Sequence, residues 1–360
     1  MKRKLGIFLI ITMLIALILI VFVGPKYQEI KLENLQTDRS LTASSSKTES
    51  SEDLGLYDKL KESKSIDILV MGNRYKMDEP DSLWIDRFKK SIHNQYDSET
   101  NVDFLTTEED RVFRLLADYS NAELESYDLI LLTIAPYGSN DEQGDQNFRL
   151  VFENLLRTVM SNNPNTEIIP VIEYGVDYEK VDQIQNLTQY YGLTYVDIKH
   201  VIESSKSSNS EYILEDQLND EGHQLASDEL FERIRAHMFQ NKRNNHQVEE
   251  FLHSGAERFS SIQVISDGGQ VDEPLSFNFT GEIIGLTFQM GSDHGIVDIY
   301  LDGEYLRSID TYSSDGDSEK TFLLNSQLAD SEHVITIQPS LLTNENAEGS
   351  ERELVRVITN

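Results

Sequence analysis

The sequence predicts two folded domains: a three-layer α/β/α domain built on a parallel sheet, followed by an all-β sandwich. Two patterns of apolar residues lead to this prediction. From Ile66 onward, short apolar runs alternate with stretches of helical periodicity, which is typical of a parallel sheet covered on both faces. Beyond about residue 250 the apolar residues recur with period two, which indicates antiparallel strands.

The N-terminus predicts a membrane anchor. The basic segment Lys2–Lys4 precedes an uncharged run of 20 residues, Leu5–Gly24, a length that spans a hydrocarbon core of about 30 Å. Phe22–Lys26 is a poor cleavage site, so we expect residues 1–25 to remain as a transmembrane signal anchor. Because the basic residues precede the span, the bulk of the chain is expected to lie outside the cytoplasm.

Residues 26–60 are expected to form a flexible extracytoplasmic stalk. The segment Ser40–Ser51 is rich in Ser, Thr and Glu. Such a segment buries too little apolar surface to offset the entropy lost on ordering. We therefore place the first folded domain after it.

The α/β domain is expected over residues 61–241. Apolar runs predict strands at Ile66–Met71, Val102–Leu105, Leu129–Ile134, Glu167–Ile172 and Leu193–Ile198. Helical patterns are found at Leu83–His93, Glu108–Tyr119, Asn147–Met160, Tyr178–Tyr191 and Asp220–Phe239. Ligands of such a sheet bind outside the carboxyl ends of its strands, so chemistry is expected around Gly72, Asn73 and Arg74.

The all-β domain is expected over residues 250–360, after the polar linker Asn241–Asn245. Val297, Ile299 and Leu301 alternate with Asp298 and Tyr300. The pair Asp302-Gly303 then precedes a second alternating run, Tyr305–Tyr312. Asp-Gly between two such runs predicts a hairpin with a type I′ turn, which needs positive φ at both central residues.

Composition excludes several classes of function. The net charge is −32, from 63 acidic and 31 basic residues, which argues against a nucleic-acid partner because phosphate binding needs concentrated Lys and Arg. The chain has no cysteine, which excludes disulfides, zinc–thiolate sites and cysteine nucleophiles. No cofactor is expected.

Four places within about residues 63–240 resemble the SGNH or GDSL-type hydrolase family. They are the strand ending in Gly72 with the later segment Ser82–Phe88, then Tyr127–Ile134, Tyr195–Ile198 and Leu218–Ala226. The resemblance implies a flavodoxin-like fold and acyl transfer. In the family a Ser attacks an ester carbonyl, a His takes its proton, an Asp three residues earlier orients the His, and a Gly amide and an Asn side chain stabilise the oxyanion.

The chain departs from the family pattern at the nucleophile. It reads Gly72-Asn73-Arg74 where the family has Gly-Asp-Ser, and an arginine can neither attack a carbonyl nor be deprotonated in a protein. The family's oxyanion Asn is lost if its motif aligns with Ala135–Tyr137, and is kept as Asn140 if the motif aligns with Gly138–Asp141. Arg74 itself is either a loop cation paired with a carboxylate or a charge facing a ligand.

The late motif allows two alignments. In one, Gln217 replaces the catalytic His, and Asp220 and His223 open a helix, with Asp220 as its N-terminal cap. In the other, Asp220 and His223 are themselves the Asp-x-x-His pair, and Ser139 is the nucleophile. The first alignment predicts a degenerate pocket, and the second an active O-acetyl esterase or acyltransferase. The degenerate pocket would comprise Gly72, Asn73, Arg74, Tyr137, Asn140 and Gln217.

Two other residues of the first domain have structural interpretations. Ser82 is expected to cap the first helix after Gly72, and Trp84 is expected to pack in the core.

The all-β domain resembles galactose-binding-like accessory modules over about residues 255–345. The segments that carry this resemblance are Phe279–Gly281 and Asp293–Gly303. Asp293 and His294 lie in a loop where they could contact a sugar or a metal. One His with one Asp is too little to assign a metal site. We therefore expect a single-pass protein of the cell envelope that binds a cell-surface glycan or an envelope protein.

Overall fold

The computed structural model describes residues 55–73, 83–107, 112–134, 142–205, 209–214, 217–240, 250–314 and 316–360. These residues belong to one compact unit, Gly55–Asn360. The expected anchor, residues 1–25, and most of the expected stalk lie outside the described residues. Within the described ranges, no helix is both long enough and apolar enough to cross a membrane.

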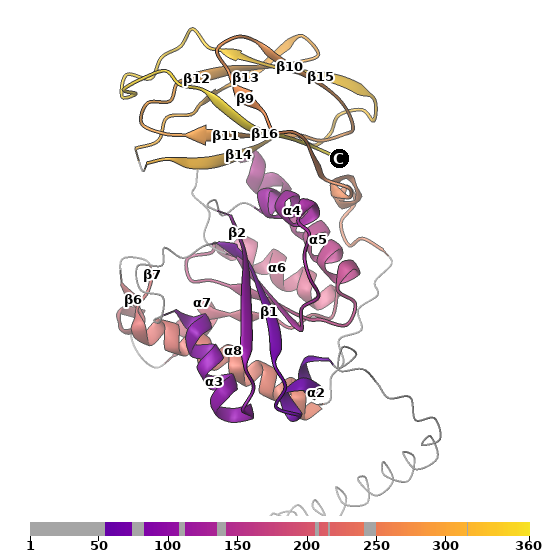
Figure 1. Cartoon of the computed structure of the whole chain (residues 1–360), viewed down its shortest axis with the longest axis vertical. Coiled ribbons are helices and arrows are strands. Elements are labelled where there is room, and N and C mark those ends of the chain that lie inside the picture. Colours follow the sequence, from indigo (N-terminus) through magenta and orange to yellow (C-terminus); the bar gives the residue numbers. More distant parts are fainter. Residues whose placement is uncertain are drawn as a thin grey trace, which may run out of the picture. The chain divides into compact units, whose positions relative to one another are not determined.

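A parallel five-stranded sheet forms the centre of the first domain (Figure 1). Its order is β2-β1-β3-β4-β5, and every neighbouring pair is parallel. This is the flavodoxin-like order, in which the strand order reverses between β1 and β3. The strands are β1 (Ile66–Asn73), β2 (Thr100–Thr107), β3 (Leu129–Ile134), β4 (Glu167–Ile172) and β5 (Val196–Asp197).

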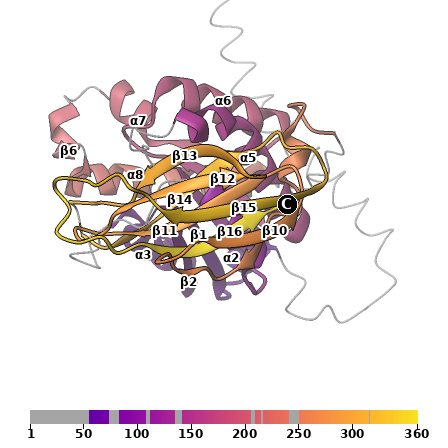
Figure 2. The ribbon, with the colours of Figure 1, turned by 90° about the horizontal axis from the view of Figure 1, so that it is seen from above.

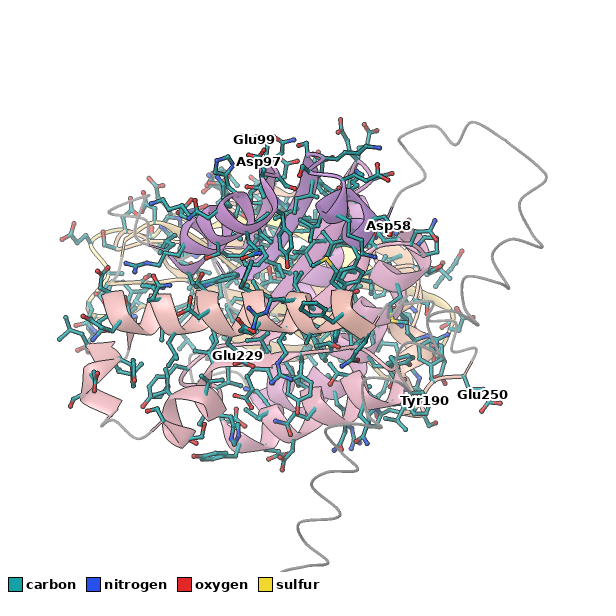
Figure 3. All side chains as sticks on the ribbon, turned by 90° about the horizontal axis from the view of Figure 1, so that it is seen from below. Asp58, Asp97, Glu99, Tyr190, Glu229 and Glu250 are labelled. Atoms are coloured by element: carbon teal, nitrogen blue, oxygen red, sulfur yellow. The ribbon has the colours of Figure 1, made fainter. Side chains whose placement is uncertain are left out.

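Helices cover both faces of this sheet, which confirms the predicted three layers. Alternate residues of β1 explain the arrangement: Ile68 and Val70 enter one core, while Leu69 and Met71 enter the other. The core with Leu69 includes α4 (Val112–Asn121), α5 (Glu142–Asn162) and α6 (Tyr178–Tyr190). The core with Ile68 includes α2 (Leu56–Lys61), α3 (Trp84–Tyr96), α7 (Ile198–Ser204) and α8 (Asp220–Gln240). Figure 3 shows α8 along the underside of the unit.

Several element boundaries differ from the predicted ones, and two of these differences have a clear local reason. The strand expected at Leu193–Ile198 is reduced to β5, because the Asp197 carboxylate accepts a hydrogen bond from the His200 amide at 2.8 Å and caps α7. The sequence predicts a flexible stalk as far as residue 60, yet α2 forms over Leu56–Lys61. Its Leu56 and Leu60 are buried in the core, so the compact part begins at Gly55.

The second domain is a β-sandwich, as predicted. One sheet has the order β10-β15-β12-β13, and the other has the order β14-β11-β16-β8 with β9 paired to β16. The strands are β8 (Gln263–Ser266), β9 (Gly269–Gln270), β10 (Leu275–Thr280), β11 (Ile284–Met290), β12 (Ile296–Leu301), β13 (Glu304–Asp310), β14 (Ser318–Asn325), β15 (Glu332–Pro339) and β16 (Glu353–Thr359). The predicted hairpin joins β12 to β13, and Asp302 and Gly303 have φ of 53° and 82°, as a type I′ turn requires.

The sandwich packs directly on α4 and α5 (Figures 1 and 2). The hydrophobic core between these helices and the sheet continues into the sandwich through Ile283, Leu323 and Ile358. Polar contacts accompany it: the Asn154 amide of α5 donates to the Ala256 carbonyl at 2.7 Å, and Ser326 donates to Asn147 at 3.1 Å. The two domains therefore share one continuous core.

Candidate functional site

Gly72 lies at the topological switch point, where β1 and β3 diverge at the carboxyl edge of the sheet. It is buried, and its φ is +125°. A Cβ built there would lie 2.2 Å from the Thr133 carbonyl oxygen and 2.4 Å from Thr133 Oγ1, which itself donates to the Met71 carbonyl. Only glycine allows β1 and β3 to approach so closely. Gly72 thus shapes the edge at which a ligand of this fold would bind.

A second carboxyl-edge residue, Glu173, was not singled out in the sequence. It follows β4 directly, its amide donates to the Ile134 carbonyl at 3.0 Å, and the residue is buried. A buried carboxylate beside the switch point is a candidate to orient a neighbouring donor. The sequence signal was weak, because an acidic residue after an apolar strand is also common in exposed loops.

The late motif begins α8, and Asn219 caps this helix. The Asn219 side chain accepts a hydrogen bond from the Gly222 amide at 3.0 Å. The predicted cap, Asp220, is therefore off by one residue. Gly222 is required here because a Cβ would lie 2.3 Å from the Tyr212 carbonyl oxygen. The Asn-Asp-x-Gly-His pattern is explained at its first and fourth positions by backbone geometry.

Asp220 and His223 lie in different environments. Asp220 is exposed, and its carboxylate accepts a 2.6 Å hydrogen bond from Arg87 of α3, which also donates to Gln224 at 3.0 Å. His223 is buried in the first turn of α8. Burial, together with the nearby Arg87 charge, lowers the pKa of His223 to about 4, although Asp220 acts in the opposite direction. The imidazole is therefore neutral at pH 7.

Gln217 takes the place of the catalytic His in the first alignment. It is exposed on the short strand β7 (Gln217–Leu218), which pairs with β6 (Ile213–Leu214). The family places its orienting Asp three residues earlier, and this chain has Leu214 there, with 67% of its surface exposed. Neither side chain of that pair can act as base or orienter.

The remaining predicted site residues lie outside the described part of the chain. These are Arg74, Tyr137, Ser139 and Asn140, and for Asn73 only the backbone, at the end of β1, is described. Their approach to Gly72 or His223 stays a prediction. Ser82 also lies outside these ranges, whereas Trp84 is buried in the core, as predicted.

A hydroxyl–imidazole–carboxylate cluster does occur elsewhere in the domain. Thr194 Oγ1 lies 2.8 Å from His237 Nε2, and His237 Nδ1 lies 3.3 Å from Glu167 Oε1 and 3.1 Å from the Tyr57 hydroxyl. Burial and the Glu167 charge raise the pKa of Tyr57. Because Glu167 opens β4, the cluster lies at the amino edge of the sheet, opposite the ligand edge. We interpret it as a structural hydrogen-bond network that connects α2, α8, β4 and the segment before β5.

In the sandwich, the structure places Asp293 and His294 in the loop between β11 and β12, as predicted. Their side chains pair at 2.9 Å. The fold also brings Glu351, from the segment before β16, to within 4.8 Å of both ligand atoms. No local sequence pattern points to this third residue, because it lies far from Asp293 and His294 along the chain.

The fold is shared with a solved two-domain esterase. A structure of a two-domain esterase (CEX) active on acetylated mannans, co-crystallised with mannopentaose, aligns with a TM-score of 0.67 at 13% identity, covering 84% of this chain and 92% of that chain. A second structure of a two-domain esterase (CEX) active on acetylated mannans gives 0.66 at 14% identity, covering 84% and 93%. No protein-family model matches the chain, and no curated protein matches its sequence.

A GDSL-like lipase structure from Bacteroides ovatus covers 48% of this chain and 98% of that chain, at 15% identity and a TM-score of 0.33. At the identities above, the likeness to the two-domain esterase shows the fold alone. That fold is an α/β domain with a parallel sheet followed by a β-sandwich. It agrees with the predicted resemblance to SGNH/GDSL-type hydrolases with an accessory module.

Proposed function

We propose that this chain is a membrane-anchored, extracytoplasmic SGNH-hydrolase-like protein that binds a cell-envelope glycan and no longer hydrolyses it. One observation carries the proposal: Arg74 follows Gly72-Asn73 where the esterase mechanism needs a hydroxyl nucleophile. The Leu214 and Gln217 positions support it, since they offer neither an orienting carboxylate nor a base. The scaffold of an esterase would then serve recognition alone.

The expected ligand is a neutral or acetylated polysaccharide. The related two-domain esterase is active on acetylated mannans and was co-crystallised with mannopentaose, which supports a glycan as ligand class. The net charge of −32 disfavours polyanionic envelope polymers. Figure 3 labels acidic residues of α2, the α3–β2 turn and α8 on the underside of the unit, at Asp58, Asp97, Glu99 and Glu229, of which Asp97 and Glu99 are exposed.

An active O-acetyl esterase or acyltransferase is the second candidate. The Asp220–His223 spacing and the neutral imidazole favour it, since a neutral imidazole can accept a proton. Two observations weigh against it. Asp220 is held by Arg87. A base with a pKa of about 4 is also poorly matched to work near pH 7.

Glycan binding is tested with residues 55–360, the compact unit, by affinity electrophoresis in gels that contain acetylated mannan, deacetylated mannan or a polyanionic teichoic acid. We expect retardation by at least one mannan and none by the polyanion. Arg74→Ala should weaken the retardation if Arg74 faces the ligand, whereas Arg235→Ala, on the exposed surface of α8, is the matched control. Retardation by the polyanion alone would contradict the proposal, as would none in any gel.

The anchor is tested separately in cells. The full chain should sediment with membranes and be degraded by protease added outside the cell, whereas a chain that starts at residue 26 behind a cleavable leader should be released. A full chain recovered in the soluble fraction would contradict the anchor and leave the glycan proposal intact.

A further inference from the structure

We propose that the sandwich binds a divalent cation through Asp293, His294 and Glu351. The potential ligand atoms of these three side chains all lie within 4.8 Å of one another. Two come from the loop after β11 and the third from the segment before β16, so only the folded chain assembles the set. An imidazole with two carboxylates is a common donor set for a protein-bound transition metal.

The backbone fixes the two segments that carry these side chains. The Gly295 amide donates to the Glu351 carbonyl at 2.8 Å, and the Glu351 amide donates to the Asp293 carbonyl at 3.0 Å. The His294 side chain is only 7% exposed, whereas that of Asp293 is 47% exposed. One ligand is therefore held rigidly, and the exposed carboxylates can adjust around a cation.

Gly291 keeps the space beside the imidazole open. A Cβ built at Gly291 would lie 2.6 Å from His294 Nδ1 and 3.0 Å from Asp317 Oδ1. Gly291 does not have positive φ, so backbone conformation does not account for glycine at this position. The missing side chain leaves room next to the nitrogen that would bind the cation.

The charge around the imidazole is strongly negative. Asp293, Asp317 and Glu351 surround it, and in the ranges that the structure describes no lysine or arginine forms an ion pair with any of the three. The nearby Arg352 guanidinium instead donates to the carbonyls of Ile296 and Ser350, each at 2.7 Å. A divalent cation would supply the missing positive charge.

The donor set favours zinc or manganese over calcium or magnesium. The latter two prefer all-oxygen sites, whereas zinc is well suited to an imidazole nitrogen, and manganese accepts such a nitrogen beside carboxylate ligands. Ligand atoms around tetrahedral zinc lie roughly 3.4 Å apart, given bonds of about 2.0–2.1 Å. The 4.8 Å spread must therefore contract on binding. Rotation of the exposed Asp293 and Glu351 side chains can supply this contraction, and the bound cation would pin the two segments together.

Calorimetric titration of residues 55–360, first freed of metal with EDTA, tests the site with ZnCl2, MnCl2, CaCl2 and MgCl2. We expect saturable binding of zinc or manganese at one site per chain, and a higher Tm at saturation. Glu351→Gln and Asp293→Asn should each weaken binding at least tenfold. Glu348→Gln removes an exposed carboxylate from the same loop and should bind like the wild type.

Three results would overturn the proposal: no saturable binding, an affinity unchanged by Glu351→Gln, or saturable binding of calcium alone. Because His294 is buried and its substitution would also disturb folding, the metal environment is read from cobalt(II) absorption of the folded wild type. A visible d–d band is expected, and it should be lost in Glu351→Gln and kept in Glu348→Gln. A band of equal strength in both variants would place the metal elsewhere.

Discussion

The Phe113 ring of α4 lies where a side chain at Gly285 of β11 would begin. A Cβ built at Gly285 would be 2.5 Å from Phe113 Cε1, and Gly285 does not have positive φ. This glycine is therefore present for close packing and not for backbone conformation. The α/β domain and the sandwich meet at this contact, within one hydrophobic core.

Gly285→Ala should weaken the contact between the two domains. Overpacking of this kind typically costs about 1–3 kcal/mol, to be measured as the loss in free energy of unfolding of residues 55–360. Phe113→Leu in the same chain should recover part of the loss, because the smaller side chain makes room. An equal loss from Gly285→Ala in both backgrounds would show that Phe113 is not the obstacle.

Four charges bridge the same interface. Arg114 of α4 pairs with Asp118 and with Glu319 of β14, each at 2.7 Å, and Arg356 of β16 pairs with Asp118 at 2.6 Å. Burial by itself lowers the pKa of Arg114, but the two carboxylates outweigh this effect and raise it. The charges balance two against two, so none is left uncompensated.

Arg114→Met should destabilise the chain by about 2–4 kcal/mol, because it leaves the carboxylates of Asp118 and Glu319 to share the single guanidinium of Arg356 in a largely buried site. Chemical denaturation measures the loss. The matched control is Arg235→Met, which breaks the exposed Arg235–Glu232 pair and should cost less than about 0.5 kcal/mol. Similar losses in the two variants would mean that the Arg114 network contributes no more than a surface pair.

Acid should destabilise the chain through His223. Burial lowers the pKa of His223 from 6.5 to about 4 in the folded state, so the unfolded chain binds more protons between these values. The contribution of His223 to the free energy of unfolding is therefore fully present above about pH 6.5. It is lost as the pH falls toward 4, and the loss is on the order of 3 kcal/mol in total.

The comparison of His223→Gln with the wild type, unfolded in denaturant at pH 7 and pH 4.5, isolates this effect. The variant should lose less stability between the two pH values than the wild type. His200→Gln, at an exposed position of α7, controls for removal of a histidine elsewhere. If His223→Gln and the wild type lose the same amount, His223 is not the group responsible.

Glu153 of α5 binds the segment around Leu252 and His253, through which the chain enters the sandwich. Its buried carboxylate accepts hydrogen bonds from the Tyr191 hydroxyl at 2.6 Å, from the amides of Leu252 and His253 at 2.5 and 3.0 Å, and pairs with His253 Nδ1 at 2.7 Å. Glu153→Leu should cost about 2–4 kcal/mol, because it leaves these donors without their acceptor.

Hydrogen exchange locates the effect of Glu153→Leu. Amides of residues 250–260 should exchange faster in this variant, while those of β12 and β13 should not. Glu250→Gln changes an exposed carboxylate on the same segment and should leave both exchange and stability within about 0.5 kcal/mol of the wild type. Faster amide exchange across the whole unit would show that Glu153 does not act locally on residues 250–260.

Much of the fold could be read from local patterns. β3 and β4 have the predicted bounds, Leu129–Ile134 and Glu167–Ile172, because strands buried on both faces form continuous apolar runs. The α8 cap was misplaced by one residue because Asn219 and Asp220 are both good caps. The position at which the sandwich packs on α4 and α5 could not be predicted, because an apolar helix face around Phe113 does not show which element covers it.

Some features of the candidate site could likewise be predicted from the sequence, whereas others depend on the fold. The departure of Gly72-Asn73-Arg74 from the family's Gly-Asp-Ser, on which the proposed loss of the nucleophile depends, is visible in the residue types alone. The exposure of Gln217, the buried Glu173 and the pairing of Asp220 with Arg87 depend on which elements the fold brings together. The contribution of Glu351 could not be predicted for the same reason. Ligands that come from distant segments of the chain show no characteristic spacing in the sequence.

The loss of catalysis is tested most directly by acetate release from acetylated mannan by residues 55–360, measured beside a heat-denatured sample. Because position 74 offers no attacking hydroxyl, we predict that the two rates are the same within error. Saturable release by the native sample, abolished by Ser139→Ala, would contradict the proposal and establish the rearranged active site instead.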